Sequence, residues 1–249
     1  MPNSLPKLAL LAGGLATRLR PLTEKIPKSL LLVAGEPFIS HQLRLLSRQG
    51  VREVVICLGY LGEQVQQFVG NGSAFGCHVD YVFDGEELRG TGGAIKGALP
   101  LLGDHFFIMY GDSYLPTSFS RVHDYYRSSG MAGLMTVFHN DNRWDVSNVD
   151  FRENRIINYD KRTPAATMKY IDYGLGILRA ESFVDWRRNE IFDLARVYES
   201  LIAKEQLAGL EIHERFFEIG SQEGLLETNE LLRELHRENT EPFNRTNTV

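Results

Sequence analysis

The segment from Leu8 to Thr23 carries the residues best suited to chemistry with phosphates. An apolar run ends at Leu11, and two glycines, Gly13 and Gly14, follow it. Glycines let the backbone approach a ligand closely, and the N–H groups of such a turn can point at anionic oxygens. Arg18 adds a planar, permanently charged guanidinium that matches two phosphate oxygens at once. The segment predicts a phosphate-binding turn, with a plain strand-to-helix turn as the alternative.

The two best-known phosphate loops do not fit this segment. Residues 13–18 lack the third glycine of the dinucleotide fingerprint G-x-G-x-x-G. The pair Lys28-Ser29 resembles the end of a Walker loop, but Pro27 stands where that loop needs glycine. Lys28 follows the arginine turn closely enough to reach the same phosphates, and the alternative is a solvated surface lysine.

Two carboxylates stand at positions that suit a metal ion. Asp112 follows the apolar run Phe106 to Tyr110 and one glycine, and ligands of parallel sheets gather at that end of a strand. Mg²⁺ is usually held by one or two carboxylates together with phosphate oxygens. Glu218 lies between Phe217 and Ile219, so strand alternation puts it on the opposite face from them. The alternatives are a helix cap at Asp112 and an exposed strand glutamate at Glu218.

A second glycine cluster, Gly90 to Gly93, opens a helix after the apolar run Val79 to Phe83, and its bare backbone could lie flat against a nucleobase. Glu86 and Glu87 precede it, and a carboxylate can accept hydrogen bonds from N1–H and the amino group of guanine. This favours GTP, although two exposed loop glutamates are the plainer interpretation. Further along, Lys161 leaves a predicted strand and could bind a second phosphate.

The elements that must position these residues alternate along the chain. Apolar runs of strand length are separated by segments of helical period, which predicts an α/β fold with a mostly parallel sheet. A later block has an antiparallel or mixed pattern, with a turn at Glu153-Asn154 between two short strands, and predicts a β-rich insertion. The expected strands are Leu8 to Leu11, Val54 to Leu58, Val79 to Phe83, Phe106 to Tyr110, Gly133 to Phe138, Val149 to Phe151, Ile156 to Tyr159 and Tyr170 to Leu178, and the expected helices include 38–50, 61–69, 192–208 and 223–236.

Composition bounds the class of protein. With 249 residues, 43% of them hydrophobic, the chain can bury a full core, and we expect one domain over 1–237 and a polar, poorly ordered tail over 238–249. A net charge of −5 argues against a nucleic-acid partner. The sequence lacks the roughly 20 apolar residues of a membrane span and the apolar stretch of a secretion signal, so we expect a cytoplasmic protein without a membrane partner. Cys57 and Cys77 lie in or beside apolar runs, as reduced core thiols do.

Taken together, these motifs resemble those of the sugar-1-phosphate nucleotidyltransferases, in particular short members such as the heptose-1-phosphate guanylyltransferases and the N-acetylmuramate-1-phosphate uridylyltransferases. The resemblance rests on Gly13-Gly14-x-x-Thr17-Arg18-Leu19-x-Pro21-Leu22-Thr23, Pro27-Lys28, Gly90-Thr91-Gly92-Gly93, Gly111-Asp112, Lys161, Gly174 and Glu218-Ile219-Gly220. It implies a three-layer αβα, Rossmann-like fold with a small β-rich, sugar-binding insertion. It also implies that an NTP and a sugar 1-phosphate give an NDP-sugar and pyrophosphate.

The resemblance also implies roles for individual residues. Arg18, Lys28, Asp112 and Lys161 would be catalytic, and Asp112 and Glu218 would hold Mg²⁺. The implied nucleotide-binding residues are Leu11, Ala12, Gly13, Gly14, Thr17, Arg18, Glu87, Gly90, Thr91 and Gly92, and the implied sugar-phosphate residues are Asn148, Lys161, Tyr173 and Gly174, with Trp144 nearby.

Several alternatives stay open at this point. GTP with a heptose or a mannose-like sugar 1-phosphate is the expected substrate pair, and UTP or dTTP is the alternative to GTP. A silent relative that binds a sugar nucleotide as a regulatory subunit is a further possibility, and a homodimer is the default oligomer. Ala16 stands where many relatives have glycine, so the loop would be strained if this residue needs a positive φ.

Overall fold

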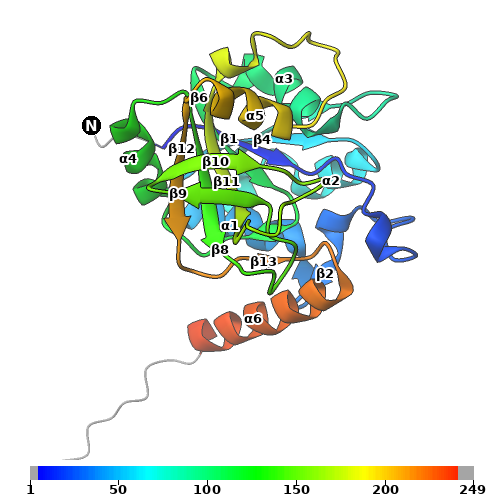
Figure 1. The fold of residues 1–249 in the computed structure, drawn as a ribbon. Coiled ribbons are helices and arrows are strands. Elements are labelled where there is room, and N and C mark those ends of the chain that lie inside the picture. Colours follow the sequence, from blue (N-terminus) through cyan, green and yellow to red (C-terminus); the bar gives the residue numbers. More distant parts are fainter. Residues whose placement is uncertain (1–4, 241–249) are drawn as a thin grey trace, which may run out of the picture.

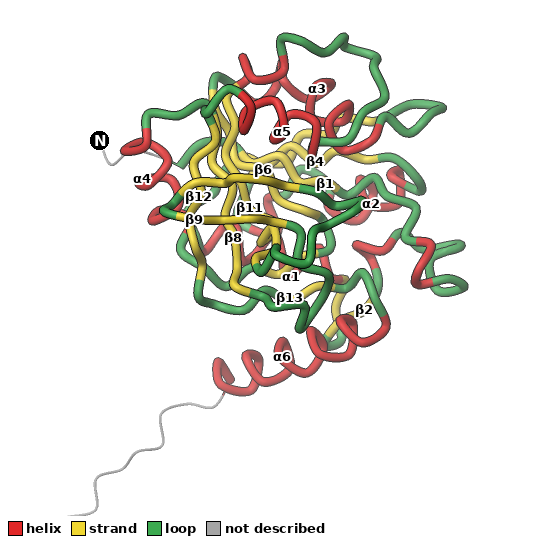
Figure 2. The backbone as a smooth tube through the Cα atoms, viewed as in Figure 1, coloured by secondary structure: helices red, strands yellow, loops and turns green. Residues whose placement is uncertain are grey.

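A nine-stranded sheet forms the centre of the computed structural model within the residues that the structure describes, 5–240, with side chains described to Glu238 (Figures 1 and 2). The strands follow the order β5-β4-β1-β6-β11-β8-β12-β10-β9. Their bounds in that order are His78–Phe83, Glu53–Leu58, Leu8–Leu11, His105–Tyr110, Tyr170–Arg179, Gly133–His139, Leu207–Ile212, Arg155–Tyr159 and Val149–Arg152.

The first four strands of this order are parallel, as the sequence predicts. Leu10 of β1 lies opposite Ile56 of β4 on one side and Met109 of β6 on the other. Because parallel strands end at the same edge of a sheet, the loops that follow β1, β5 and β6 meet there. These loops carry the phosphate-binding turn, the second glycine cluster and Asp112.

The other half of the sheet is mixed. β11 runs antiparallel to both β6 and β8, β8 is parallel to β12, and β12 is antiparallel to β10. β9 and β10 form the predicted hairpin, with Glu153 and Asn154 at positive φ in its turn. The sheet is therefore mixed, as predicted, with parallel pairing in its first four strands and between β8 and β12.

One helix prediction is wrong in its extent. The sequence predicts a helix over 192–208, whereas α5 covers Ala195–Ala203 and the strand β12 begins at Leu207. β12 is hydrogen-bonded on both edges, between β8 and β10. Gly209 fits there because an added Cβ atom would lie 2.6 Å from the Phe151 ring. Pairing in the sheet overrides the helical pattern of the sequence at this point.

Helices cover both faces of the sheet. The helices α1 (Phe38–Arg48), α2 (Gly62–Val69) and α4 (Phe119–Ser129) pack with Leu8 and Leu10 of β1. The helices α3 (Gly90–Leu102) and α5 pack on the other face with Ala9. Alternate residues of one strand thus enter two separate cores, which confirms the three-layer αβα prediction. Short 3-10 helices lie at Thr17–Leu19, Lys28–Leu30, Ser73–Phe75 and Ala180–Phe183.

The last helix, α6 (Gln222–Thr240), crosses one end of the body (Figure 1). Its Leu232 packs with Ile219 in a third, small core. Two short sheets lie beside this core, β2 (Leu32–Val33) with β3 (Glu36–Pro37) and β7 (Ser113–Tyr114) with β13 (Phe217–Glu218). α6 continues into the segment predicted as a tail, whose remainder, 241–249, lies outside the described residues.

Both cysteines are free and buried in the core, as predicted. Burial raises the pKa of Cys57 to about 12, so this thiol stays protonated and unreactive. Among the described residues, no helix has the length and apolarity needed to cross a bilayer.

Candidate functional site

The predicted phosphate-binding turn leaves β1 and passes close to the end of β4. A Cβ atom added at Gly13 would lie 2.8 Å from the Gly59 backbone nitrogen, so only glycine fits without a shift. Around Gly14 the space is open, with nothing within 4 Å of an added Cβ. Ala16 has φ 48° and ψ 43°, a left-handed conformation, and its carbonyl accepts a hydrogen bond from the Thr23 hydroxyl at 2.8 Å. The predicted strain at Ala16 is therefore present.

A cavity of about 240 Å³ opens beside this turn. Six of the residues expected to bind nucleotide line it, namely Leu11, Ala12, Gly13, Gly14, Gly90 and Thr91. Lys28 and Asp112 also line it. The first and second glycine clusters, far apart in sequence, thus face one space. We call it the nucleotide cavity.

Four of the expected nucleotide residues lie elsewhere. Thr17, Arg18 and Glu87 are exposed and do not line this cavity. Gly92 instead packs against the chain before α5, where its backbone N–H donates to the Phe192 carbonyl at 3.0 Å. A Cβ atom there would collide with the Phe192 ring, so this glycine is required for packing.

Asp84 lines the nucleotide cavity and was not singled out from the sequence. The residue is 8% exposed, and its Oδ2 accepts a hydrogen bond from the Arg89 backbone N–H at 3.2 Å. Burial raises the pKa of this carboxyl, although the hydrogen bond and the charge of Arg89 oppose the shift. The sequence offered a sign of this position, since Asp84 directly follows β5 much as Asp112 follows β6 after one glycine.

Asp112 lies at the centre of the site, paired with Lys28 at 2.5 Å between Nζ and Oδ2. Burial opposes ionisation of Asp112, but the charges of Lys28 and, less strongly, Arg18 hold the pKa of the carboxyl below its usual value. The turn is fixed from α1 by the fully buried Gln42, whose amide donates to the Tyr110 carbonyl at 3.2 Å and the Ser113 carbonyl at 2.8 Å. Asp112 is thus ionised and held in place.

A second cavity of about 440 Å³ shares Tyr110 and Asp112 with the first. All four residues expected to bind the sugar phosphate line it, namely Asn148, Lys161, Tyr173 and Gly174, together with Arg18 and Glu218. We call it the sugar cavity. Trp144, which was expected nearby, does not line this cavity. Its ring instead lies against the Arg215 guanidinium, whose Cζ atom is 3.8 Å from the centroid of the Trp144 ring.

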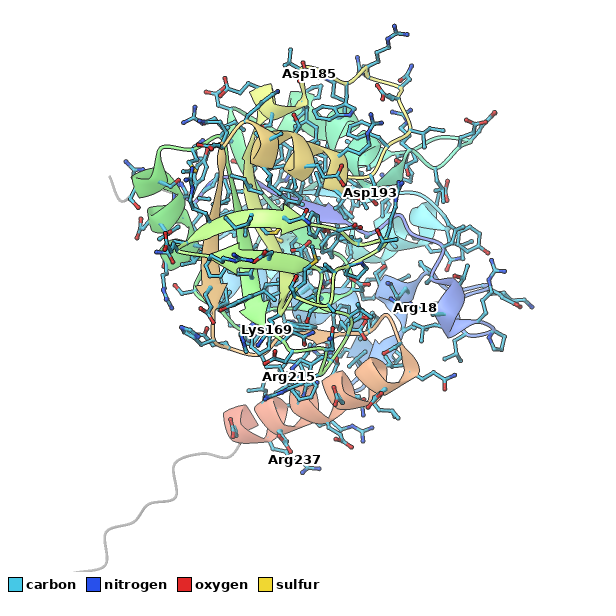
Figure 3. All side chains as sticks on the ribbon, viewed as in Figure 1. Arg18, Lys169, Asp185, Asp193, Arg215 and Arg237 are labelled. Atoms are coloured by element: carbon cyan, nitrogen blue, oxygen red, sulfur yellow. The ribbon has the colours of Figure 1, made fainter. Side chains whose placement is uncertain are left out.

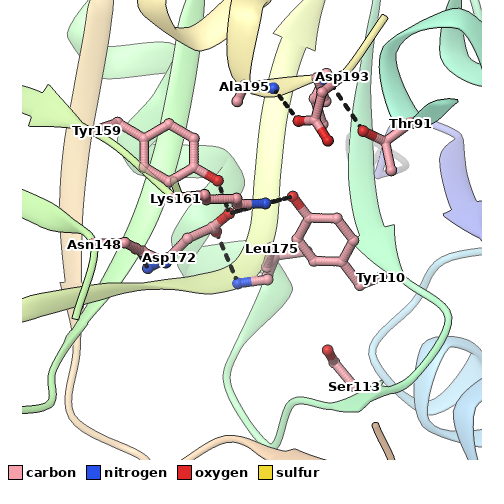
Figure 4. A network of polar contacts seen from close by, with 12 residues as sticks. Thr91, Tyr110, Ser113, Asn148, Tyr159, Lys161, Asp172, Leu175, Asp193 and Ala195 are labelled. Atoms are coloured by element: carbon pink, nitrogen blue, oxygen red, sulfur yellow. Dashed lines mark hydrogen bonds and ion pairs between the residues drawn. The ribbon is translucent and has the colours of Figure 1, made fainter. Parts of the chain in front are cut away.

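Lys161 belongs to a polar network at the junction of the two cavities (Figure 4). Its ammonium donates to the Tyr110 hydroxyl at 2.9 Å and lies 3.8 Å from Asp172. The Asp172 carboxylate, only 6% exposed, also accepts hydrogen bonds from Tyr110 at 3.3 Å and Tyr159 at 3.0 Å. Burial, reinforced by the charge of Asp172, raises the pKa of both tyrosines, which keeps their hydroxyls protonated as donors.

The carboxylates of Asp112 and Glu218 both lie close to Gly220. A Cβ atom at Gly220 would lie 3.3 Å from Asp112 Oδ2 and 3.0 Å from Arg18 Nη2, and it would collide with the Glu218 carboxylate. Pairing of β13 with β7 places Glu218 opposite Ser113. Glu218 accepts hydrogen bonds from the Gly220 N–H and, at 2.8 Å, from the Ser221 hydroxyl.

The described residues form no group of three or more His, Cys, Asp or Glu side chains that could hold a metal ion. A cation at Asp112 and Glu218 would therefore need further oxygens from a ligand. Two carboxylates completed by phosphate oxygens are a donor set that Mg²⁺ accepts. The residues present fit such an ion.

The two glycines of the turn give a stability prediction. Gly13→Ala should lower the free energy of unfolding by about 1–3 kcal/mol, because the added methyl group meets backbone atoms that cannot move aside. Gly14→Ala should change it by less than about 0.5 kcal/mol, because the space there is open. Chemical denaturation measures both values. Equal losses in the two variants would contradict the packing described here.

The Lys28–Asp112 pair gives a pH prediction. The folded-state pKa of Asp112 lies below its usual value, so the pair stabilises the fold above about pH 4, and this contribution is lost as the pH falls through the folded pKa. Lys28→Met should lower the free energy of unfolding by about 1.5 kcal/mol at neutral pH. The difference from the unmodified protein should shrink below about pH 4. Urea titrations at several pH values would refute this if the difference stayed constant.

Comparison with known sequences agrees with the site. A 107-residue match at 42% identity links the chain to an N-acetylmuramate alpha-1-phosphate uridylyltransferase of Neisseria meningitidis, covering 43% of this chain and 46% of the relative. The chain thus spans about half the length of that relative. A D-glycero-alpha-D-manno-heptose 1-phosphate guanylyltransferase of Campylobacter jejuni is 24% identical over 214 residues, which cover 86% of this chain and 94% of the relative.

Solved structures share the fold. A structure described as a putative glucose-1-phosphate thymidylyltransferase from Bacillus anthracis has a TM-score of 0.80 at 19% identity, covering 91% of this chain and 95% of its own. HddC from Yersinia pseudotuberculosis has a TM-score of 0.76 at 22% identity, covering 92% and 100%. The family model described as nucleotidyl transferase matches residues 7–145, more than half of the sequence. The chain therefore belongs to the nucleotidyl transferase family.

Proposed function

We propose that this protein transfers a nucleoside monophosphate from an NTP to a sugar 1-phosphate, which gives an NDP-sugar and pyrophosphate. The observation that carries the proposal is the junction of the two cavities at Tyr110 and Asp112. The glycine turn borders one cavity and Lys161 borders the other. The names of the two curated relatives, a uridylyltransferase and a guanylyltransferase of sugar 1-phosphates, support this reaction class.

The reaction needs no base from the protein. A phosphate monoester has its second pKa near about 6, so the sugar phosphate is already an anion at neutral pH. One of its oxygens attacks the α-phosphorus, the bond to the β-phosphate oxygen breaks, and the electron pair leaves with pyrophosphate. The protein must overcome repulsion between two anions, and the positive charges of Arg18, Lys28 and Lys161 can reduce it.

Asp112 and Glu218 would hold Mg²⁺ in this reaction, together with phosphate oxygens of the substrates. When bound, Mg²⁺ neutralises the triphosphate and polarises its phosphoryl oxygens. The low pKa of Asp112 supports this assignment, because a carboxylate must be ionised to bind a metal.

For the base we propose guanine, with Asp84 as the residue that recognises it. Asp84 lines the nucleotide cavity, whereas Glu86 and Glu87, to which the sequence pointed, are exposed. A carboxylate can accept both N1–H and the amino group of guanine, while uracil offers one N–H flanked by two carbonyl oxygens that an anion repels. The Campylobacter relative is a guanylyltransferase of a heptose phosphate, which favours GTP with a heptose or mannose-like sugar.

Two other expectations remain predictions from the sequence. These are the homodimer and the cytoplasmic location.

Loss of the arginine tests the reaction. With Mg²⁺, GTP and a panel of sugar 1-phosphates, the protein should release pyrophosphate, and Arg18→Ala should lower turnover by roughly a hundredfold. Arg20→Ala is the matched control, since Arg20 is exposed two residues on and lines neither cavity. Binding of an NDP-sugar without any pyrophosphate release would instead identify a silent regulatory relative.

Substitution of Asp84 tests whether the protein prefers guanine as the nucleobase. Asp84→Asn should lower the ratio of kcat/KM for GTP to that for UTP by about tenfold or more, because the amide NH₂ group opposes the guanine donors. Glu87→Gln is the control and should leave the ratio unchanged, since Glu87 is outside the cavity. Preference of the unmodified protein for UTP or dTTP would reject guanine.

A further inference from the structure

More negative than positive side chains line the sugar cavity. Two cations line it, Arg18 and Lys161, and so do four carboxylates, those of Asp112, Asp145, Asp172 and Glu218. The proposed function uses both cations for phosphate groups. No third lysine, arginine or histidine lines this cavity among the described residues.

Three of the four carboxylates have partners inside the protein. Asp112 pairs with Lys28, and Glu218 accepts from Gly220 and Ser221. Asp172 accepts hydrogen bonds from two tyrosines and, at 3.0 Å, from the Gly174 N–H. In the proposed reaction these three carboxylates would also lie beside the metal ion or Lys161. Positive charge therefore offsets their negative charge, and they would repel a charged sugar only weakly.

Asp145 differs from these three. Its Oδ1 accepts a hydrogen bond from the N–H of its neighbour Val146 at 2.7 Å, and the side chain is exposed where it lines the cavity. No cation lies within ion-pair distance of it in the described part of the chain. Its negative charge is therefore presented to whatever enters the cavity.

The loop that carries Asp145 is held in position. The Asn140 amide donates to the Asp145 carbonyl at 2.7 Å and to the Ser147 hydroxyl at 3.1 Å. The guanidinium of Arg215, which is labelled beside α6 in Figure 3, lies 3.8 Å from the centroid of the Trp144 ring and 4.8 Å from that of the Phe217 ring. Arg215 also pairs with Glu227 of α6. Asp145 thus has a fixed place at the cavity wall.

We propose that Asp145 makes the protein selective for sugar 1-phosphates whose sugar part is uncharged, against those that carry a carboxylate, such as uronic or muramic acids. This inference rests on the proposed function. A sugar hydroxyl can donate a charge-assisted hydrogen bond to Asp145. A sugar carboxylate would meet a like charge, with no cation of the cavity left to pair with it.

Matched substrate pairs test this selectivity. The pairs are glucose 1-phosphate with glucuronic acid 1-phosphate, and mannose 1-phosphate with mannuronic acid 1-phosphate. For each pair both kcat/KM, with Mg²⁺ and GTP, and the equilibrium Kd are measured. The unmodified protein should favour the neutral member by about tenfold or more, as expected for like charges near a protein surface.

Asp145→Asn should reduce that preference to within about threefold, because it removes the charge and keeps an oxygen for the Val146 N–H. Asp141→Asn is the matched control. Asp141 lies on the same loop and does not line the cavity, so this variant loses the same charge and should keep the full preference.

The outcomes separate the two proposals. Equal or better use of the uronic acids by the unmodified protein, an unchanged ratio in Asp145→Asn, or binding of neither member of either pair would overturn the role of Asp145. Absence of pyrophosphate release with every sugar 1-phosphate would overturn the proposed function, while the Kd ratios would still decide the role of Asp145.

Discussion

The contact between Lys28 and Asp112 is the interaction on which the site depends. A carboxylate at the end of a buried strand is costly unless a cation offsets it, and here the ammonium lies 2.5 Å away. Asp112 lines both cavities, so the ammonium that offsets its charge is also the one that we propose to bind phosphates. The arrangement requires the phosphate-binding turn, β6 and β13 to end at one place. The parallel half of the sheet and the short pairing of β7 with β13 provide this.

The features of the fold and the site that depend on neighbouring residues in the sequence could be predicted. Strand alternation and glycine turns located β1, β4, β5 and β6, and with them the edge where Asp112 lies. The turn at Glu153-Asn154 could also be predicted, because asparagine tolerates the left-handed backbone that it adopts here. Lys161, Tyr173 and Gly174 reach one cavity as expected from the family pattern, although their individual roles remain proposals.

Residues that act through distant contacts could not be predicted. Tyr110 looks like one more apolar strand residue until Lys161 and Asp172 are seen on its hydroxyl. Gly92 appeared suited to a nucleobase, yet Phe192, a hundred positions further on, occupies that side of it. The helix expected over 192–208 runs two residues into β12, because the place of β12 between two other strands depends on pairing with distant segments.

Ala16 has a consequence for how the turn meets its ligand. An alanine in left-handed backbone costs about 1 kcal/mol relative to glycine, and the fold tolerates this cost. Alanine, however, samples far fewer backbone conformations than glycine. The turn therefore loses less conformational entropy when it binds a ligand. A glycine at position 16 would give the turn a broader range of backbone conformations, so the alanine lowers stability slightly and makes the turn more preorganised.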